Sequence, residues 1–276
     1  MSADMKIRSF NVGCNHEIIL PNGKTILVDP YFPETLPQDC QKECICGADY
    51  ILLTHSHFDH DAEVEYFVKK YNAKVFCGFM SAMAVLEYHH VPFDNMIPVF
   101  PGHTYHMDGF TVEVSQAKHN EMQGKTYDPD MDLAPILGGR PGHHQCDVLG
   151  SIESTDYRIV TDTGFSIAFV SGIHLWEDRI IECQEQKSNV VIRQATMREG
   201  GKQVSPEKLA QLFTQYKSQI VVPFHNENVE RRLVGITIQE YFSQVDTYIQ
   251  KLAPGCQVKY LETGKWYSMG CTVHMV

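Results

Sequence analysis

Short apolar runs separated by turn residues fill the first part of the chain. Residues 6–12 and 16–21 read K-I-R-S-F-N-V and H-E-I-I-L-P, and Asn22-Gly23 separates the second run from K-T-I-L-V-D-P at 24–30. An Asn-Gly pair between apolar runs is a strong hairpin signal. The run A-D-Y-I-L-L-T-H at 48–55 is apolar throughout its centre, as in a strand buried on both faces. We therefore expect four strands here.

The periodicity becomes helical after residue 61, where apolar positions recur three and four residues apart over 64–71. A strand is expected over 73–77 and a helix over 81–89. The runs N-M-I-P-V-F at 95–100 and F-T-V-E-V-S-Q-A-K-H at 110–119 predict a hairpin that turns at Asp108-Gly109.

The second half repeats this order of elements. Ser205 followed by Pro206 is a good N-terminal cap for a helix. Strands are expected at 149–154, 157–161, 165–171, 189–193, 219–225 and 258–262, and helices at 176–185, 205–216 and 237–252. Two blocks of hairpins followed by β-α units favour two sheets packed face to face with helices outside.

The expected fold class is therefore α/β, an αββα sandwich of two mixed β-sheets with helices on both outer faces. Residues 1–276 are expected to form a single domain, since layered α/β enzymes of this length commonly do. Residues 120–147 hold many glycines and prolines without periodicity, and a loop of that length is usually functional or disordered.

Composition narrows the classes of protein. No apolar run of about 18 residues could span a bilayer, and the first residues lack a secretory pattern, so we expect a cytoplasmic protein without membrane contact. A net charge of −11 without a basic stripe argues against long nucleic acids as partners. A small-molecule substrate is expected, and a homo-oligomer is left open.

The nine cysteines are an odd number, and most are expected to be reduced and buried. Cys40, Cys44 and Cys46 lie closest together, but no second C-x-x-C or C/H pair completes a tetrahedral set. A structural zinc site at this cluster is therefore disfavoured.

The stretch L-T-H-S-H-F-D-H-D at 53–61 is the main chemical signal. On an extended segment residues i and i+2 point the same way, so His55 and His57 can present both rings to one ion. Asp59 and His60 follow where the chain turns into the next helix, and can face a second ion about 3.5–4 Å from the first. So many candidate ligands together at a strand end disfavour ordinary surface histidines.

This H-x-H-x-D-H stretch resembles the signature of the metallo-β-lactamase superfamily, whose fold agrees with the expected sandwich. The resemblance implies that His119, after T-V-E-V-S-Q-A-K, is the third histidine of the first metal site. It implies that His225, after Q-I-V-V-P-F, is the last histidine of the second. The segments N-G-K-T-I-L-V-D-P, A-D-Y-I-L-L-T-H and I-V-V-P-F-H-N-E are similar to the branch that contains L-ascorbate-6-phosphate lactonase.

The superfamily normally supplies a bridging aspartate from a strand end, and here two places compete. Asp162 lies in Thr161-Asp162-Thr163-Gly164, which reads as a hairpin turn because an apolar strand follows at once. The place that we prefer, Ser171 to His174, has no aspartate, so His174 would stand in as a ligand or a supporting group. One or two divalent ions are expected, zinc first, with manganese, iron or nickel as alternatives.

The resemblance implies hydrolysis by a water whose pKa the metals lower. Asp59 would orient the water and take its proton, and His174, His143 or His144 would protonate the leaving oxygen. The leading hypothesis is a metal-dependent hydrolase of a small ester, lactone or phosphoester. The alternatives are a phosphodiesterase acting on a nucleotide, including a cyclic one, or on RNA, and a degenerate metal-binding member with a sensing role.

Overall fold

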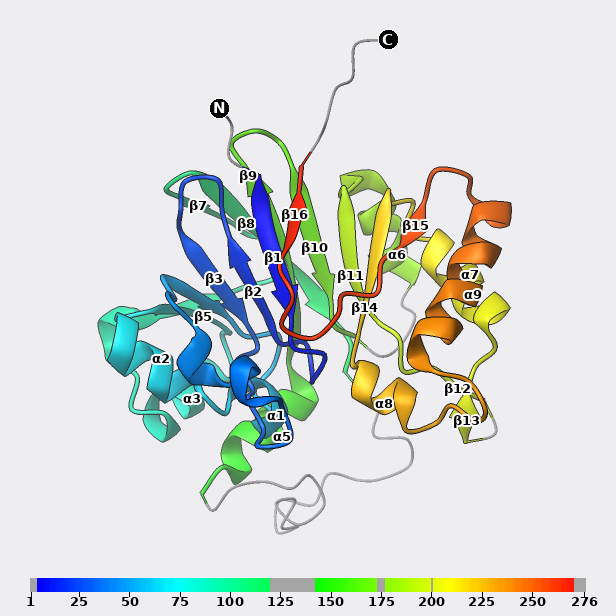
Figure 1. The fold of residues 1–276 in the computed structure, drawn as a ribbon. Coiled ribbons are helices and arrows are strands. Elements are labelled where there is room, and N and C mark those ends of the chain that lie inside the picture. The colour runs from blue at the N-terminus through cyan, green and yellow to red at the C-terminus, as the bar shows by residue number, and fades with distance from the viewer. Residues whose placement is uncertain (1–3, 120–141, 173–176, 200, 271–276) are drawn as a thin grey trace.

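Two seven-stranded sheets pack face to face in the computed structural model, which describes residues 4–119, 142–172, 177–199 and 201–270 (Figure 1). The first sheet has the order β16-β1-β2-β3-β4-β5-β6 and the second the order β15-β14-β11-β10-β9-β8-β7. The strands of the first sheet are β1 (Met5–Ser9), β2 (His16–Ile19), β3 (Thr25–Val28), β4 (Tyr50–Leu52), β5 (Lys74–Gly78), β6 (Met96–Val99) and β16 (Tyr267–Met269). Those of the second are β7 (Thr104–Met107), β8 (Phe110–Ala117), β9 (Ser154–Thr161), β10 (Ser166–Val170), β11 (Val190–Gln194), β14 (Ile220–Phe224) and β15 (Gln257–Val258).

Each sheet is antiparallel at one side and parallel at the other. In the first sheet β1, β2 and β3 pair antiparallel, and β3 to β6 pair parallel. In the second sheet β7 to β10 pair antiparallel, and β10, β11, β14 and β15 pair parallel. A short ribbon of β12 (Arg198–Glu199) and β13 (Lys202–Gln203) stands apart from both sheets.

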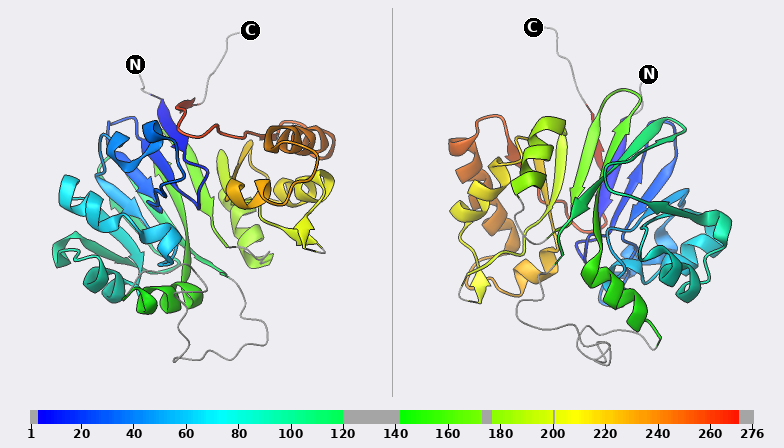
Figure 2. Two further views of the ribbon diagram at one scale, coloured as in Figure 1. Left: turned by 60° about the horizontal axis from the view of Figure 1, so that its bottom comes forward. Right: turned by 180° about the vertical axis from the view of Figure 1, so that it is seen from behind.

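Helices cover both outer sides of the sandwich, as the two views of Figure 2 show. On the side of the first sheet lie α1 (Phe58–Asp61), α2 (Val64–Tyr71), α3 (Ala82–Tyr88) and α5 (His144–Ile152). On the side of the second lie α6 (Glu177–Gln186), α7 (Pro206–Thr214), α8 (Asn226–Glu230) and α9 (Ile238–Leu252). Single 3₁₀ turns occur at η1 (Gln38–Cys40), η2 (Lys42–Cys44) and η3 (Phe93–Asn95). The expected αββα architecture is confirmed.

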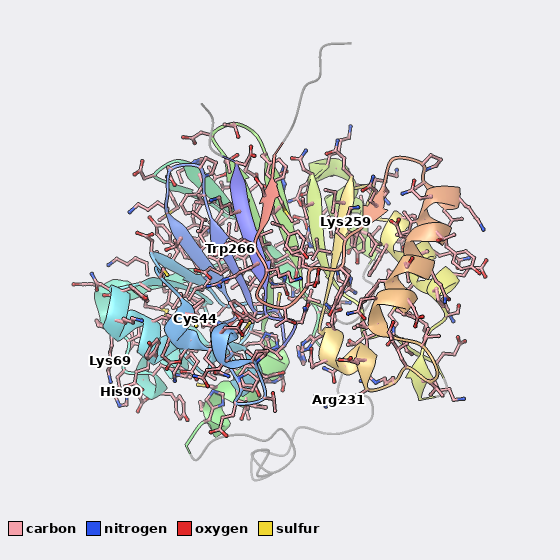
Figure 3. The ribbon with its side chains drawn as sticks, in the orientation of Figure 1. Cys44, Lys69, His90, Arg231, Lys259 and Trp266 are labelled. Atoms are coloured by element: carbon pink, nitrogen blue, oxygen red, sulfur yellow. The ribbon has the colours of Figure 1, made fainter. Side chains whose placement is uncertain are left out.

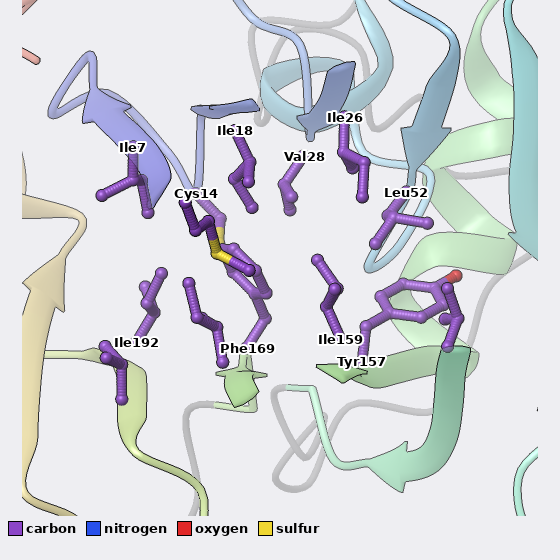
Figure 4. Close-up of a cluster of buried hydrophobic side chains, with 14 of the residues drawn as sticks. Ile7, Cys14, Ile18, Ile26, Val28, Leu52, Tyr157, Ile159, Phe169 and Ile192 are labelled. Carbon is purple, nitrogen blue, oxygen red and sulfur yellow. The ribbon is translucent and has the colours of Figure 1, made fainter. Parts of the chain in front are cut away.

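The main core lies between the sheets (Figure 4). Alternation along β3 builds it, because Ile26 and Val28 point into this core while Leu27 points to the helices outside. Phe169 on β10 and Ile192 on β11 fill the opposite side and are fully buried. Two further apolar clusters bury the faces between each sheet and its helices.

The sheets are also joined directly at the edge where β4 ends. Thr155 N on β9 donates to Thr54 O at 2.8 Å, and the Tyr157 hydroxyl donates to Leu53 O at 2.8 Å. Both bonds are buried, where hydrogen bonds are costly to leave unmade. The separation of the sheets is therefore set at this edge by hydrogen bonds as well as by apolar packing.

The prediction of a hairpin from residues 95–100 and 110–119 is wrong for its first strand. Met96–Val99 pairs parallel with β5 in the first sheet, and Thr104–Met107 pairs with β8 around Asp108-Gly109. The chain passes from one sheet to the other at the Pro101-Gly102 turn, where Gly102 has a φ of +84°. The strand T-Y-H-M alternates between exposed and half-buried side chains, and Tyr105 and Met107 pack against the main core, but four residues are too short for a clear signal.

Two other expectations are wrong. The run L-G-S-I-E-S at 149–154 is mostly helical, because α5 extends to Ile152 and β9 begins at Ser154. The strand expected at 258–262 is only Gln257–Val258, and the last strand is instead Tyr267–Met269 beside β1. Short apolar runs do not distinguish a helix from a strand by periodicity alone.

The helix cap expected at Ser205 is confirmed, and the structure adds a second one at Thr237. The Ser205 hydroxyl accepts a bond from Lys208 N, with Pro206 at the first helical position. Thr237 and Glu240 form a reciprocal capping box at the start of α9. Among the described helices, none is long and apolar enough to cross a membrane.

The three cysteines at residues 40–46 differ in their exposure to solvent. Cys40 is buried, Cys46 is exposed, and Cys44, labelled in Figure 3, is half-buried. None of the three belongs to a group that could hold a metal ion within the part of the chain that the structure describes.

The core between the sheets predicts a large effect of truncating Phe169. We expect Phe169→Ala to lower the free energy of unfolding by about 3–5 kcal/mol, because it leaves a cavity in a fully buried position. The matched control is Phe93→Ala, whose side chain is 78% exposed, with an expected change within about 0.5 kcal/mol. Urea unfolding followed by circular dichroism measures both, and equal effects would contradict the position of the core.

Candidate metal centre

The segment between β4 and α1 forms one edge of the centre. It is extended up to His57, which has φ −75° and ψ 153°, and α1 begins at the next residue. This extended run lets His55 and His57 point to one side, as their spacing predicts. Thr54 anchors the run, because its backbone N–H donates to Asp29 Oδ1 at 2.7 Å and its hydroxyl to Asp29 Oδ2 at 2.6 Å.

His119 joins these two histidines from the other sheet, two residues after β8 ends. The ring centroids lie 4.7 Å apart for His55 and His57, 4.5 Å for His55 and His119, and 4.6 Å for His57 and His119. One ligand atom from each lies within 4.8 Å of the others. We call these three residues the first triad.

In the first triad, the ring nitrogens that make no hydrogen bond to a neighbouring residue are the candidate metal ligands. His57 Nε2 lies 2.9 Å from Ser151 Oγ, so Nδ1 is the free nitrogen of that ring. His55 Nδ1 lies 3.1 Å from Thr54 Oγ1, while His55 Nε2 is buried without a hydrogen-bond partner. His119 Nδ1 is buried and without a partner too. Buried nitrogens of this kind are expensive unless a ligand satisfies them, so the residues fit a divalent metal.

Asp59, His60 and His225 form a second group, with ligand atoms again within 4.8 Å of one another. We call it the second triad. His60 Nδ1 lies 2.8 Å from Asp29 Oδ2, which leaves Nε2 toward Asp59 Oδ1 at 3.8 Å. His225 Nδ1 lies 2.7 Å from Glu227 Oε1, and its Nε2 is likewise free. In both histidines a carboxylate fixes the ring, as outer partners of metal-binding histidines usually do.

The loop between β1 and β2 packs against the second triad. A Cβ on Gly13 would lie 2.8 Å from Asp59 O, and Gly13 has a φ of +53°, so glycine is needed for the close approach. Gly13 O accepts from His225 N at 3.2 Å, and Asn226 Nδ2 donates to Asn11 Oδ1 at 2.8 Å. His225 itself has a left-handed φ of 56°. This loop thus positions His225, from the second sheet, beside Asp59.

Charge within the centre differs between the triads. Burial lowers the pKa of His119 to about 3 and holds that of His55 well below its usual value, and neighbouring imidazoles lower both further. Burial also opposes charge on His60, but the carboxylates of Asp59 and Asp29 outweigh it and raise its pKa to about 9. The first triad is therefore a set of neutral imidazoles with lone pairs available for a cation.

Asp29 is the residue that the sequence analysis missed. It is fully buried at the end of β3 and contacts both Thr54 and His60. The signal was present, because Asp29 follows the apolar run of β3, and β3 is parallel to β4. Parallel neighbours end at the same edge of a sheet, so a carboxylate after β3 lies beside the ligands after β4.

Asp162 is ruled out as the bridging ligand. Gly164 N donates to Thr161 O at 2.8 Å, so the expected hairpin turn is present and Asp162 is exposed on it. In the register of β8 and β9, Thr161 opposes Phe110 and Ser154 opposes Ala117. The turn therefore lies at the opposite end of β9 from His119, about 30 Å away at the usual rise per residue.

The preferred place, Ser171 to His174, begins at the correct edge. Ser171 Oγ lies 3.4 Å from Ser154 Oγ, and a Cβ on Gly172 would lie 2.7 Å from Lys118 O, next to His119. His174 itself lies outside the described residues, so its role stays a prediction.

His143 does not face the triads. Its ring is fully buried, with Nε2 2.9 Å from Asp61 Oδ1 and Nδ1 3.0 Å from Asp147 Oδ1. With both nitrogens against carboxylates, it is not placed to protonate a leaving group. The side chain of His144 lies outside those that the structure describes.

Curated metal-dependent hydrolases match part of the chain in sequence. A stretch of 98 residues is 37% identical to a UPF0173 metal-dependent hydrolase of Geobacillus sp. (strain WCH70), covering 36% of this chain and 41% of that protein. A stretch of 103 residues is 27% identical to a UPF0173 metal-dependent hydrolase of Metallosphaera sedula, covering 37% and 46%. The matches thus span less than half the length of these curated relatives.

Solved structures share the fold over nearly the whole chain. An isothiocyanate hydrolase from Delia radicum gut bacteria has a TM-score of 0.67 at 13% identity, covering 96% of this chain and 99% of that one. Igni18, a metallo hydrolase from Ignicoccus hospitalis, has a TM-score of 0.65 at 14% identity, covering 97% and 100%. At these identities the likeness shows the fold.

The family itself is shown by sequence. Residues 17–174, more than half of the chain, match the metallo-beta-lactamase superfamily, and this match includes the first triad and the H-x-H-x-D-H stretch. The chain belongs to the metallo-beta-lactamase superfamily.

Proposed function

We propose that the chain is a metal-dependent hydrolase of a small ester, lactone or phosphoester, with two divalent ions, zinc first. The observation that carries this proposal is the contact between the two triads, whose His55 and His60 rings have centroids 3.8 Å apart. Two neighbouring ions, when bound, lower the pKa of a water and polarise the group that it attacks.

Asp59 is the proton acceptor in this proposal. Its side chain is 32% exposed, whereas that of His60 is only 3% exposed, so Asp59 is the group of the second triad that a substrate and a water can reach. Burial disfavours its charge, but His60 and His225 outweigh burial and hold the pKa of Asp59 below its usual value. The carboxylate is therefore ionised near neutral pH, oriented toward the centre and able to accept a proton.

We assign His174 the protonation of the leaving oxygen, or a place among the ligands. Support comes from Gly172, whose backbone packs against Lys118 beside His119. A general acid must lie within hydrogen-bond reach of the leaving group, and the residues after Gly172 start at the edge of the first triad.

A lactone is the first substrate class to test, because three segments resemble the L-ascorbate-6-phosphate lactonase branch. The curated relatives are named metal-dependent hydrolases. A structural neighbour with a TM-score of 0.55 and 14% identity, covering 98% of each chain, is a diphosphatase of the PhnP family. A panel of lactones, p-nitrophenyl acetate and bis-p-nitrophenyl phosphate would therefore cover carbon and phosphorus electrophiles. No turnover on any of them with two metals bound would favour the sensing alternative.

Removing one histidine of the first triad tests the metal assignment. We expect His55→Ala to lose one equivalent of zinc, because only two ligands of the triad remain. Activity should fall by more than the roughly 10–100-fold that loss of an outer partner costs. Elemental analysis and turnover measure the two effects, with His103→Ala, an exposed histidine, as control. Full metal content and activity in His55→Ala would refute the site.

Asp59→Asn tests the proton acceptor. We expect kcat to fall by about 10²–10⁴-fold, since an amide cannot take the proton of the attacking water. The first triad should keep its zinc, because Asp59 is not among its residues. The control Asp94→Asn changes an exposed carboxylate on the surface. Unchanged kcat in Asp59→Asn would exclude this role.

Asp29→Asn tests the outer carboxylate. An amide has nearly the same shape, and Asn tolerates the left-handed φ of 47° that Asp29 adopts. It removes the charge that orients His60, so we expect about 10–100-fold weaker zinc binding at the second triad only. Competition with a chromophoric chelator measures both affinities. Asp162→Asn is the control, and equal losses in the two variants would contradict the assignment.

A further inference from the structure

A third group of metal-binding residue types lies behind the H-x-H-x-D-H stretch, outside both triads. It consists of Asp61 at the end of α1, with His143 and Cys146 at the start of α5. They are 0%, 0% and 1% exposed, and one ligand atom from each lies within 4.8 Å of the others. The proposed reaction uses none of them.

A fourth donor reaches this group from α3. His89 follows that helix, is 2% exposed, and places its Nε2 3.0 Å from Asp61 Oδ2. His143 Nε2 lies 2.9 Å from both oxygens of Asp61. The next histidine, His90, is 72% exposed at its side chain and is labelled at the surface in Figure 3. His89 is therefore the one of this pair that is turned inward.

Several polar atoms in this group have no hydrogen-bond partner. His89 Nε2, His143 Nδ1 and Asp147 Oδ2 are buried, and none of them makes a hydrogen bond of acceptable geometry. The two nitrogens do lie 3.0 Å from carboxylate oxygens, so these contacts have the right length and the wrong direction. Burial raises the pKa of Asp61, but contact with His143 and His89 outweighs it and holds that pKa below its usual value. An ionised carboxylate, two imidazoles and a thiol therefore lie together in one buried place.

We propose that Asp61, His89, His143 and Cys146 bind a third divalent cation, zinc by preference. One thiolate, two imidazoles and one carboxylate are all donor types that zinc binds, and four donors match its tetrahedral preference. The site holds no open position toward the surface, because all four side chains are buried. On binding, the thiol of Cys146 and the ring of His143 each lose a proton to solvent, since burial opposes charge on His143 but Asp147 and Asp61 raise its pKa to about 9.

The position of this site gives it a structural task. The Ser56 hydroxyl donates to Cys146 O at 2.7 Å, and Phe58 N donates to Asp147 Oδ1 at 3.3 Å. Gly150 abuts His57, because a Cβ there would lie 2.9 Å from the His57 ring. A cation that joins α1, α3 and α5 fixes α5, the helix against which His57 of the first triad packs.

Cobalt substitution tests this site directly. Protein produced with Co²⁺ as the only added transition metal should show a thiolate-to-cobalt charge-transfer band. Within the described part of the chain neither triad contains a cysteine, so the band reports on the third site alone. The variant His55→Ala/His225→Ala, which weakens both triads, should keep the band and retain about one equivalent of cobalt.

Cys146→Ser should lose the band and one equivalent of metal. Cys183→Ser, a matched change at another buried cysteine on the far side of the second sheet, should keep both. His89→Gln gives an independent variant if Cys146→Ser fails to fold, and it should also lose one equivalent. Absence of the band from the unmodified protein with two or more cobalt ions bound would overturn the proposal. Persistence of the band in Cys146→Ser would also overturn the proposal. So would the finding that His143 only forms ion pairs with Asp61 and Asp147 and that no metal is bound there.

Discussion

The metal centre depends on the contacts of the buried Asp29 carboxylate. A fully buried charge is costly unless hydrogen bonds surround it, and Asp29 accepts bonds from the backbone and hydroxyl of Thr54 while facing His60 Nδ1. It therefore links the end of β3, the start of the ligand segment and the second triad. Without it, the bond that Thr155 donates to Thr54 O would still hold the ligand segment, but His60 would lose the carboxylate that orients its ring.

A comparable constraint works between the sheets. The ligands come from strands of both sheets, so the centre forms only if the two halves keep their separation and register. The loop around Gly13 contacts Asp59 on one side and His225 on the other. The backbone of this short loop thus fixes the positions of Asp59 and His225 relative to each other, although the two residues are far apart in the sequence.

The parts of this molecule that could be predicted from sequence are those whose signal is local. The spacing of His55, His57, Asp59 and His60 lies within one segment, and the Asn22-Gly23 hairpin and the capping box of α9 are short-range patterns. The superfamily resemblance supplied His119 and His225, which no local pattern indicates. The pairing of β6 and the helical state of residues 149–152 depend on tertiary packing instead. Likewise, the contact of His143 with Asp61 joins residues 82 positions apart, which a single sequence does not reveal.

The hydrogen bonds that tie Thr54 to Thr155 and Leu53 to Tyr157 make the sandwich unequal along its length. At the ligand edge the layers are fastened by directional bonds, whereas the main core between the sheets is apolar and non-directional. The hairpin ends of the two sheets are joined as well, since Asn22 Nδ2 donates to Asp108 O at 2.7 Å, but that bond is exposed and water can replace it. Losing a bond at the ligand edge leaves a buried polar group unpaired, so the metal ligands are positioned by the bonds between the sheets that are most costly to break.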